Sequence, residues 1–385
     1  MPHQNRKKAY KYKAYYIYNP VSLDTSPHSR QHTNTTMSNA TDTQINREIN
    51  RNMDLYILKH IDRLDSLCCD DIDDVCGFTK NDVKKRASEI KEYRKELDVL
   101  LQLPLMKQRT EEWYEARKTR LTASDLYDAI KGNNVSIKLA KKKANIVIDT
   151  INYNGIPALK WGTMFEPMAT RCYSQKMNDI AIHDFGLVCD TENEHFGASP
   201  DGINELGIML EIKCPYSRKI EDGVIPEKYK MQIQGQLAVC KLKECDYIEC
   251  VFKSLDSVEE YLALDCEDED GNTVKHGVIA EYYNSKGEYV YYYSEPNRTP
   301  KECVDDICNS DSSGINPDKS LKFSKYTYWR LDEMIIQRVV FNAKAWETIV
   351  PKINAFWESV EEYKSLPLLP IETGMKKYMF VKDDD

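Results

Sequence analysis

The sequence predicts an α/β fold with a central mixed β-sheet flanked by helices and an N-terminal helical extension. Segments with helical and strand periodicity alternate as helix, strand, strand, strand, helix and strand between residues 161 and 252. Residues 46–101 repeat apolar side chains at helical spacing. The stretch FGASPDGINELGIMLEIKCPY (196–216) joins short apolar runs through glycines, which is typical of paired strands.

Composition sets the class of protein. The chain has 385 residues, of which 41% are hydrophobic and 30% charged, as in soluble globular proteins. It has no apolar run of about 18 residues, so no membrane span is expected. The start MPHQNRKKAYKYK has no apolar segment and is not a secretory signal. We therefore expect the twelve cysteines to be free thiols in a reducing compartment, and their spacing disfavours a zinc site.

The charge distribution is uneven. A net charge of −9 argues against a protein that coats DNA, but it does not exclude a DNA enzyme, because phosphates meet a local surface. Residues 107–143 carry ten Lys and Arg against five Asp and Glu, a local charge of +5. A solvated helix face is the alternative explanation of this basic region.

Shifts in composition divide the chain into six parts. Residues 1–45 are polar and poor in large apolar side chains, which predicts disorder. The helical extension is expected to serve packing or a partner. The remaining boundaries are placed where turn-rich, acidic or amphipathic stretches begin or end. The predicted boundaries are a disordered tail at 1–45, a helical extension at 46–101, a core at 102–255, an acidic β-rich insertion at 256–323, a strand and helix that complete the core at 324–370, and a tail at 371–385.

Asp201, Glu211 and Lys213 form a D-X9-E-X-K pattern. Glu211 and Lys213 lie on one face of a strand because the side-chain period of a strand is two, and a turn returns Asp201 to the same edge. Two carboxylates and the carbonyl of Ile212 are hard oxygen ligands suited to Mg²⁺ or Mn²⁺. Such an ion would acidify a water and offset charge on a phosphoryl group. The sequence therefore predicts a metal-dependent site for phosphodiester hydrolysis.

Two further side chains are candidates for this site. Gln232 could hydrogen-bond the attacking water or Lys213, which itself could orient or deprotonate that water. Glu166 could complete the metal shell or hold a second ion, although its spacing from Thr163 also fits a capping box. The alternative for the whole pattern is a surface hairpin with a cross-strand ion pair. The apolar residues around Glu211 favour an interior strand, where an unpaired charge is costly.

A phosphate site is predicted in the basic region. Thr122 and Ser124 open a predicted helix beside Arg117, and a helix N-terminus with hydroxyl groups can hold a phosphate. Simple capping is the alternative role of these hydroxyls. The predicted DNA-binding and phosphate-binding residues are Arg117, Thr122, Ser124, Lys141, Lys142 and Lys143.

Five motifs occur in a recognisable order: EEWYEARKTRLTASD, LKWGTMFEPMA, SPDGI, LEIKCPY and YKMQIQGQLAV. Through them the sequence resembles the lambda-exonuclease/YqaJ-type viral recombinase nucleases of the PD-(D/E)XK superfamily. The resemblance covers residues 107–252 and resumes weakly over 324–362. It implies a restriction-endonuclease-like core and a Mg²⁺-dependent 5′-to-3′ exonuclease acting on double-stranded DNA ends for recombination, repair or replication.

The resemblance assigns roles by motif. It implies that Asp201, Glu211 and the Ile212 carbonyl bind the metal and that Lys213 activates water. Arg117 and Ser124 would hold the phosphate of the DNA end, and Trp113 fits a family position or packs. Glu166 and Gln232 correspond to the second acid and the motif glutamine, which completes the implied catalytic set: Glu166, Asp201, Glu211, Lys213 and Gln232.

The resemblance also implies partners. Some family members form ring trimers and act with a single-strand annealing protein, so a homo-oligomer and such a partner are expectations. Chain size and tail composition suggest a large DNA virus, and hence the cytoplasm or nucleus of a host cell. The alternatives are a structure-specific or nicking endonuclease with the same site, and a non-catalytic DNA-binding or assembly protein. An iron–sulfur nuclease is disfavoured because no CxxC cluster follows the core.

Overall fold

The computed structural model divides the chain into the units Met1–Thr41 and Asp42–Asp385, and the second is the one described here. Both predicted tails lie outside the described residues, except that 42–45 are helical, so the first helix begins earlier than expected. In the described part, no helix is both long and apolar enough to cross a membrane. The described residues are 42–61, 78–104, 106–146, 156–267, 273–308 and 320–366.

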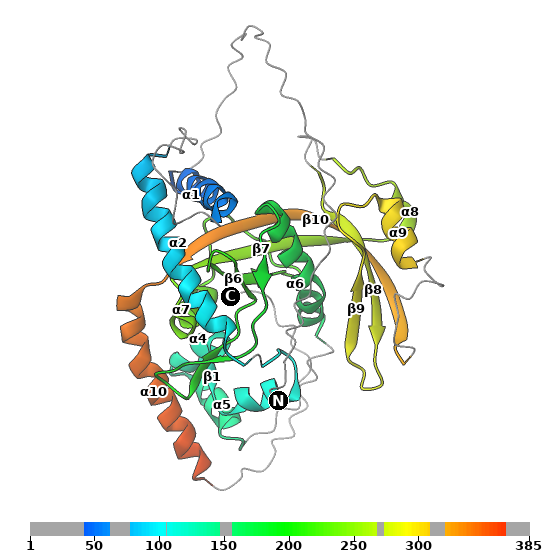
Figure 1. Ribbon diagram of the computed structural model, residues 1–385. Coiled ribbons are helices and arrows are strands. Elements are labelled where there is room, and N and C mark those ends of the chain that lie inside the picture. The colour runs from blue at the N-terminus through cyan, green and yellow to red at the C-terminus, as the bar shows by residue number, and fades with distance from the viewer. Residues whose placement is uncertain are drawn as a thin grey trace, which may run out of the picture. The chain divides into compact units, whose positions relative to one another are not determined.

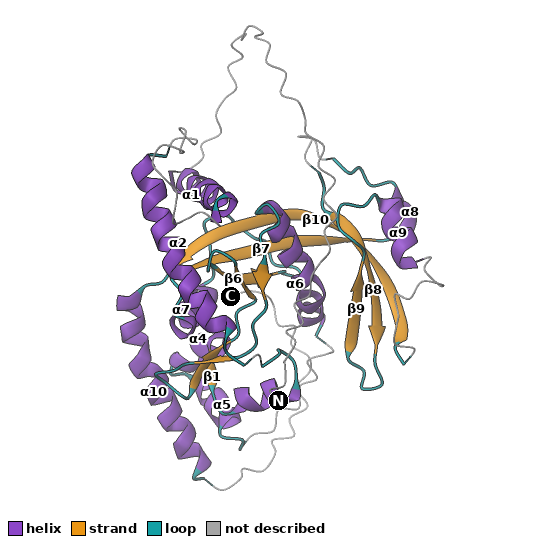
Figure 2. Ribbon diagram, in the orientation of Figure 1, coloured by secondary structure: helices purple, strands orange, loops and turns teal. Residues whose placement is uncertain are grey.

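A seven-stranded mixed sheet forms the centre, with strand order β2-β5-β6-β7-β10-β8-β9 (Figure 2). Neighbouring strands β6 and β7 are parallel, whereas the other pairs in this sheet are antiparallel. A smaller sheet has the order β1-β4-β3. The strands are β1 (Leu121–Thr122), β2 (Ile182–His183), β3 (Val188–Cys189), β4 (Phe196–Ala198), β5 (Gly202–Asn204), β6 (Met209–Lys213), β7 (Glu244–Leu255), β8 (His276–Tyr283), β9 (Tyr289–Tyr293) and β10 (Lys322–Val340).

Helices cover both faces of the central sheet (Figure 1). The fold class is therefore confirmed as mixed α/β with a helical N-terminal extension. The helices are α1 (Asp42–Lys59), α2 (Lys80–Leu101), α3 (Glu111–Lys118), the short 3-10 turn η2 (Ala123–Asp125), α4 (Leu126–Ile130), α5 (Asn134–Lys143), α6 (Pro157–Lys176), α7 (Glu227–Cys240), α8 (Val258–Leu262), α9 (Pro300–Cys308) and α10 (Ala343–Lys364).

Helix α2 illustrates why the predicted helices form. Its N-cap Thr79 and residue Asp82 bond reciprocally to each other's backbone N–H, so two otherwise unpaired donors are satisfied. Its buried face consists of residues at helical spacing, including Val83, Ala87 and Ile90. The helix ends at Leu101, which is the predicted end of the helical extension.

The stretch 196–216 differs from its predicted form. It contains three strands instead of two, because β4 joins the smaller sheet and only β5 and β6 form the hairpin. Only Gly207 marks a turn, with φ of +78°, and a Cβ there would lie 2.6 Å from the Tyr93 carbonyl. Gly202 instead lies within β5, where a Cβ would be 2.7 Å from Ile182. The turn and the close approach of α2 thus both require glycine at 207.

The predicted acidic insertion is also less β-rich than expected, since its described residues include the helices α8 and α9. Its strands β8 and β9 extend the main sheet beyond β10. Cysteines throughout the described ranges are free thiols.

Alternation along β6 separates two cores. Leu210 and Ile212 pack in the cluster that includes residues of α6, whereas Met209 packs in the cluster that includes residues of α7. Because side chains alternate along a strand, Glu211 and Lys213 lie on the α7 side. The sheet therefore directs the candidate carboxylate toward the glutamines of α7.

A buried ionic network joins the helical extension to the sheet. Arg86 of α2 bonds Asp54 of α1 at 2.7 Å and Glu244 of β7 at 2.6 Å. Arg338 of β10 bonds Asp246 at 2.7 Å and Asp54 at 3.0 Å, and it also pairs with Glu244. These buried ion pairs fix the helical extension to the core. The extension therefore packs against the core, which was one of the two roles expected for it.

This network predicts acid sensitivity. Burial alone would raise the pKa of Glu244, but Arg86 and Arg338 lower it from 4.5 to about 2. A lowered folded-state pKa contributes stability that is present above pH 4.5 and is lost as the pH falls toward 2, by about 3 kcal/mol in the free energy of unfolding. Chemical unfolding measured between pH 6 and pH 2.5 tests this. Glu244→Gln should lose less stability over that interval, and an unchanged pH dependence in this variant would contradict the assignment.

Candidate active site

Glu211 is the centre of the candidate site. Its side chain is fully buried and accepts hydrogen bonds from Gln232 at 2.7 Å and from Gln236 at 2.8 Å, both on α7. Lys213, two residues along β6, forms an ion pair with the same carboxylate. The predicted same-face placement of Glu211 and Lys213 is therefore what the structure has. Gln232 bonds the carboxylate and not Lys213, contrary to one of its expected roles.

Asp201 lies at the start of β5 and is tied to β6. Its Oδ2 accepts a hydrogen bond from the backbone N–H of Ile212 at 2.7 Å. Burial raises the pKa of Asp201, and the negative charges of Glu211 and Glu166 raise it further. Like-charged carboxylates are thus held near one another, which is costly without a cation.

Glu166 reaches the site from α6, and its side chain is 34% exposed. The capping-box explanation is wrong, because α6 begins at Pro157, so Thr163 lies inside the helix and not at its N-cap. Glu166 pairs with Arg109 at 3.3 Å. Burial raises the pKa of Glu166, Arg109 and Lys213 oppose this rise, and the charge of Glu211 adds to it.

Lys213 is held as an ammonium group. Burial lowers the pKa of Lys213, but the carboxylates of Glu211 and Asp201 outweigh burial and raise it above its usual value. Its Nζ also lies 5.0 Å from the centre of the Tyr229 ring, a cation–π contact. In this arrangement Lys213 is a hydrogen-bond donor that can orient a water or phosphate oxygen.

The donor set fits a hard divalent cation. Three acidic side chains, Asp201, Glu211 and Glu166, lie beside the two basic side chains Lys213 and Arg109. The mutual repulsion of the carboxylates favours a bound cation. Among the described residues, no group of three His, Cys, Asp or Glu side chains could hold a metal ion by itself. A cation would therefore need a carbonyl oxygen and waters beside the two hairpin carboxylates, as Mg²⁺ commonly does.

The basic entrance is built around Arg117, Trp113, Thr122 and Ser124. The Arg117 guanidinium lies 4.2 Å from the centre of the Trp113 ring and donates to the hydroxyls of Thr122 at 3.2 Å and Ser124 at 3.3 Å. Thr122 occupies the N-cap position of η2 but makes no capping hydrogen bond there. Its hydroxyl therefore serves the Arg117 cluster, so simple capping does not explain it.

Hydrogen bonds connect this entrance to the carboxylates. Trp113 Nε1 donates to Ser199 Oγ at 3.1 Å, and Gln236 Nε2 approaches the Ser199 carbonyl at 3.4 Å while bonding Glu211. Close packing of η2 against α7 supports the connection, since a Cβ at Gly235 would lie 3.3 Å from the Ala123 Cβ. The two predicted parts of the site thus belong to one assembly.

The three consecutive lysines do not act as one group. Lys143 donates to the Arg117 carbonyl at 2.9 Å and lies 3.5 Å from Asp125. Lys141 instead lies 5.6 Å from the centre of the Tyr363 ring on α10, and Lys142 is exposed. Successive residues of a helix point about 100° apart, so the three side chains face different directions, and their binding of DNA stays a prediction.

Some side chains of the site were not predicted. Gln236 lies four residues after Gln232, and this helical spacing was a usable signal for a second glutamine on the same face. Arg109 carries no such signal. Glu249 was also missed: it is fully buried beside Lys213 in the strand pairing and is held by Arg218 and by Tyr247 Oη at 2.8 Å.

Residues 112–243 match the family model of the YqaJ-like viral recombinase domain. The resemblance inferred from the motifs is thereby confirmed over this segment, which contains Glu166, Asp201, Glu211, Lys213 and Gln232. The YqaJ-like segment ends at the start of β7, so part of the central sheet lies beyond it.

The chain is also similar to proteins of large DNA viruses. An uncharacterized protein of Acanthamoeba polyphaga mimivirus is 25% identical over 318 residues, covering 70% of this chain and 55% of its own length. A protein of African swine fever virus is 27% identical over 178 residues, covering 38% of this chain and 50% of its own. The chain thus spans about half the length of these relatives.

Among solved structures, the alkaline exonuclease LHK-Exo from Laribacter hongkongensis is similar at 18% identity and a TM-score of 0.41, covering 66% of this chain and 93% of its own. A phage-related exonuclease from Haemophilus somnus gives 10% identity and a TM-score of 0.32, with coverages of 64% and 93%.

Proposed function

We propose that this chain is a metal-dependent DNA exonuclease that hydrolyses one strand from double-stranded ends, in the 5′-to-3′ direction, for recombination, repair or replication of viral DNA. The observation that carries the proposal is the buried Glu211 carboxylate, paired with Lys213 and linked through Gln236 and Ser199 to the basic entrance. The YqaJ-like match over 112–243 and the viral relatives support it.

Asp201, Glu211 and the Ile212 carbonyl would hold Mg²⁺ or Mn²⁺, which when bound would acidify a water and offset charge on the scissile phosphate. Gln232 and Gln236 fix the Glu211 carboxylate from one side, so its orientation does not depend on the substrate. Lys213 would orient the attacking water or neutralise a phosphate oxygen. Glu166 holds the guanidinium of Arg109 at the open edge of the site and remains the candidate for a second ion.

Digestion of linear duplex DNA labelled separately at each 5′ and 3′ end tests the proposal. We expect Mg²⁺-dependent release of label from the 5′ ends first, with no release in the presence of EDTA or by Asp201→Asn. Closed circular DNA should resist cleavage. Efficient cutting of closed circles would instead favour a structure-specific or nicking endonuclease, and no metal-dependent release at all would favour a non-catalytic DNA-binding protein.

The entrance predicts a preference for phosphorylated ends. Arg117→Gln removes the cation beside Ser124, so digestion of a 5′-phosphorylated end should slow by about 10- to 100-fold, as for loss of a charge-assisted hydrogen bond. A 5′-hydroxyl end should be affected much less. Lys95→Gln is the control, because this lysine of α2 is 68% exposed, pairs with Glu92 and is not part of the predicted entrance. Equal slowing of both end types by Arg117→Gln would argue for a purely structural role.

The proposal extends to partners and location. A homo-oligomer, such as the ring trimer of some relatives, would enclose the DNA end, and a single-strand annealing protein would receive the remaining 3′ strand. A protein that acts on viral DNA would be located in the cytoplasm or nucleus of the host cell.

A further inference from the structure

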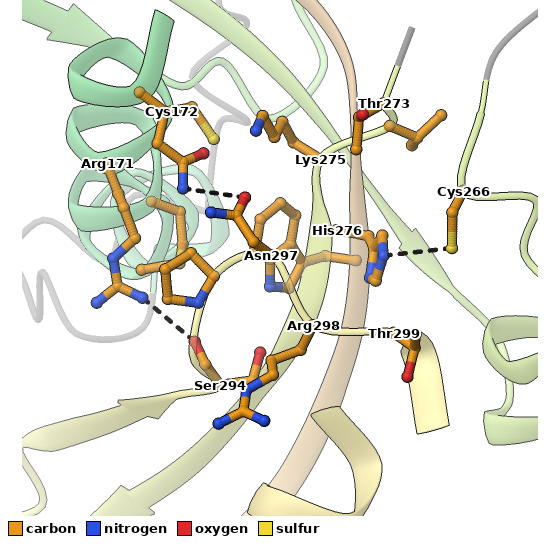
Figure 3. A pocket seen from close by; sticks show the side chains of 15 residues that line it. Arg171, Cys172, Cys266, Thr273, Lys275, His276, Ser294, Asn297, Arg298 and Thr299 are labelled. Atoms are coloured by element: carbon orange, nitrogen blue, oxygen red, sulfur yellow. Dashed lines mark hydrogen bonds between the residues drawn. The ribbon is translucent and has the colours of Figure 1, made fainter. Parts of the chain in front are cut away.

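A cavity of about 410 Å³ lies between α6 and the segments flanking β8 and β9. None of its 15 lining residues belongs to the candidate active site. Figure 3 shows Arg171 and Cys172 on α6 facing Lys275, His276 and Asn297 across the cavity. The volume lies within the range of about 300–1,000 Å³ typical of small-molecule sites.

The described residues of the lining are more basic than acidic. They include Arg171, Lys275 and Arg298 and no Asp or Glu, although the chain as a whole carries a net charge of −9. Arg171 donates to the Ser294 carbonyl at 3.2 Å, a contact that positions the guanidinium without neutralising it. Arg298 forms two long ion pairs with α9, to Glu302 at 3.8 Å and to Asp306 at 3.9 Å, and its side chain is 47% exposed. The cavity therefore favours an anion.

The lining also contains apolar side chains and an unsatisfied donor. Met168, Val274, Pro296 and Trp329 contribute to the lining. Trp329 is only 4% exposed, and its indole N–H has no hydrogen-bond partner within the described structure. Buried donors without an acceptor are uncommon, so an acceptor supplied by a ligand would complete this site. The occupant suggested is an anion that also carries a flat group with acceptor atoms.

We propose that this cavity is a second nucleotide site, in which the phosphate contacts Arg171, Lys275 and Arg298 and the base lies against Trp329. The choice of a nucleotide among such anions rests on the proposed function, because the proposed reaction releases nucleoside monophosphates. The nucleotide is either free or part of a single strand. Helix α6 carries both Arg171 and Glu166, so an occupied cavity lies against the helix that also serves the candidate active site.

Calorimetric titration of the full chain with deoxyadenosine 5′-monophosphate tests the site. EDTA is present throughout, so that metal-dependent binding at Asp201 and Glu211 does not contribute. The double variant Lys275→Gln/Arg298→Gln should bind at least about tenfold more weakly, from the loss of charge-assisted contacts. Lys301→Gln, an exposed lysine of α9 outside the lining, should bind as the wild type does. Deoxyadenosine and inorganic phosphate should each bind at least about tenfold more weakly than the monophosphate, since each lacks one half of the contacts.

A 5′-phosphorylated tetranucleotide distinguishes the two sources. If it binds, and loses affinity in the double variant while the monophosphate does not bind, the occupant is a nucleotide within a strand. Circular dichroism melting must show the double variant folded, and Arg298→Lys, which keeps the charge, should retain most of the affinity. Equal binding of both probes by wild type and double variant, or binding of neither, overturns the site. Loss of binding in the double variant of a protein that digests no DNA would support the nucleotide site and refute the exonuclease proposal.

Discussion

Glu211→Gln is expected to reduce metal-dependent digestion of linear duplex DNA by at least about 100-fold, because a proposed metal ligand and the charge that holds Lys213 disappear together. The substitution preserves the shape of the side chain. Initial rates with end-labelled duplex, measured at equal protein and Mg²⁺ concentration, give the comparison. Lys213→Ala should fall to a similarly low rate.

A control for this prediction lies on the neighbouring helix. Glu227→Gln changes an acid of α7 whose side chain is 64% exposed and leaves the site untouched, so its rate should stay within about twofold of wild type. Calorimetry or circular dichroism must show Glu211→Gln folded. A folded Glu211→Gln with more than half of the wild-type rate would remove the carboxylate from the mechanism.

Arg338→Met is expected to give the largest loss of stability, about 3–5 kcal/mol in the free energy of unfolding. The substitution leaves Asp54, which has no exposed surface, and Asp246, which is 4% exposed at its side chain, short of a cation in a buried place. Buried charges without partners are far more costly than lost surface pairs. Urea unfolding at pH 7 measures the difference.

Arg330→Met supplies the comparison on the same strand. Arg330 pairs with Asp332 at 2.7 Å, but both side chains are about a third exposed, so its loss should cost no more than about 1 kcal/mol. Adding Asp246→Asn to Arg338→Met should restore part of the lost stability by removing an unpaired charge. If Arg338→Met is no more destabilising than Arg330→Met, the network does not anchor the helical extension.

Sequence patterns correctly predicted those features that depend on interactions between residues close in the sequence. The side-chain period of two placed Glu211 and Lys213 on one face of β6, and helical periodicity gave the end of the helical extension at residue 101. The predicted function followed from these residues and from motif order, not from the basic region alone.

Predictions failed for features that depend on contacts between residues far apart in the sequence. Strands β1, β3 and β4 have two or three residues each, too few for any periodicity, so the smaller sheet has no signature in the sequence. The pairing of Arg109 with Glu166 joins residues 57 positions apart. Thr163 and Glu166 have the spacing of a capping box, but α6 already starts at Pro157. Thr163 therefore lies inside the helix, and a capping motif forms only at a helix end.

Strand β10 has a mechanical consequence for the molecule. Its residues 328–330 pair with β7 on one side and β8 on the other, and the register shift between Leu331 and Glu333 follows at once. Such irregularities bend a strand, so β10 turns near the place where it exchanges one neighbour for another (Figure 1). The β8–β9 hairpin is thus a rigid extension of the main sheet, and no hinge separates the hairpin from the sheet. A displacement of its tip is transmitted through the paired strands β8 and β10 to β7, which pairs with β6, the strand that carries Glu211.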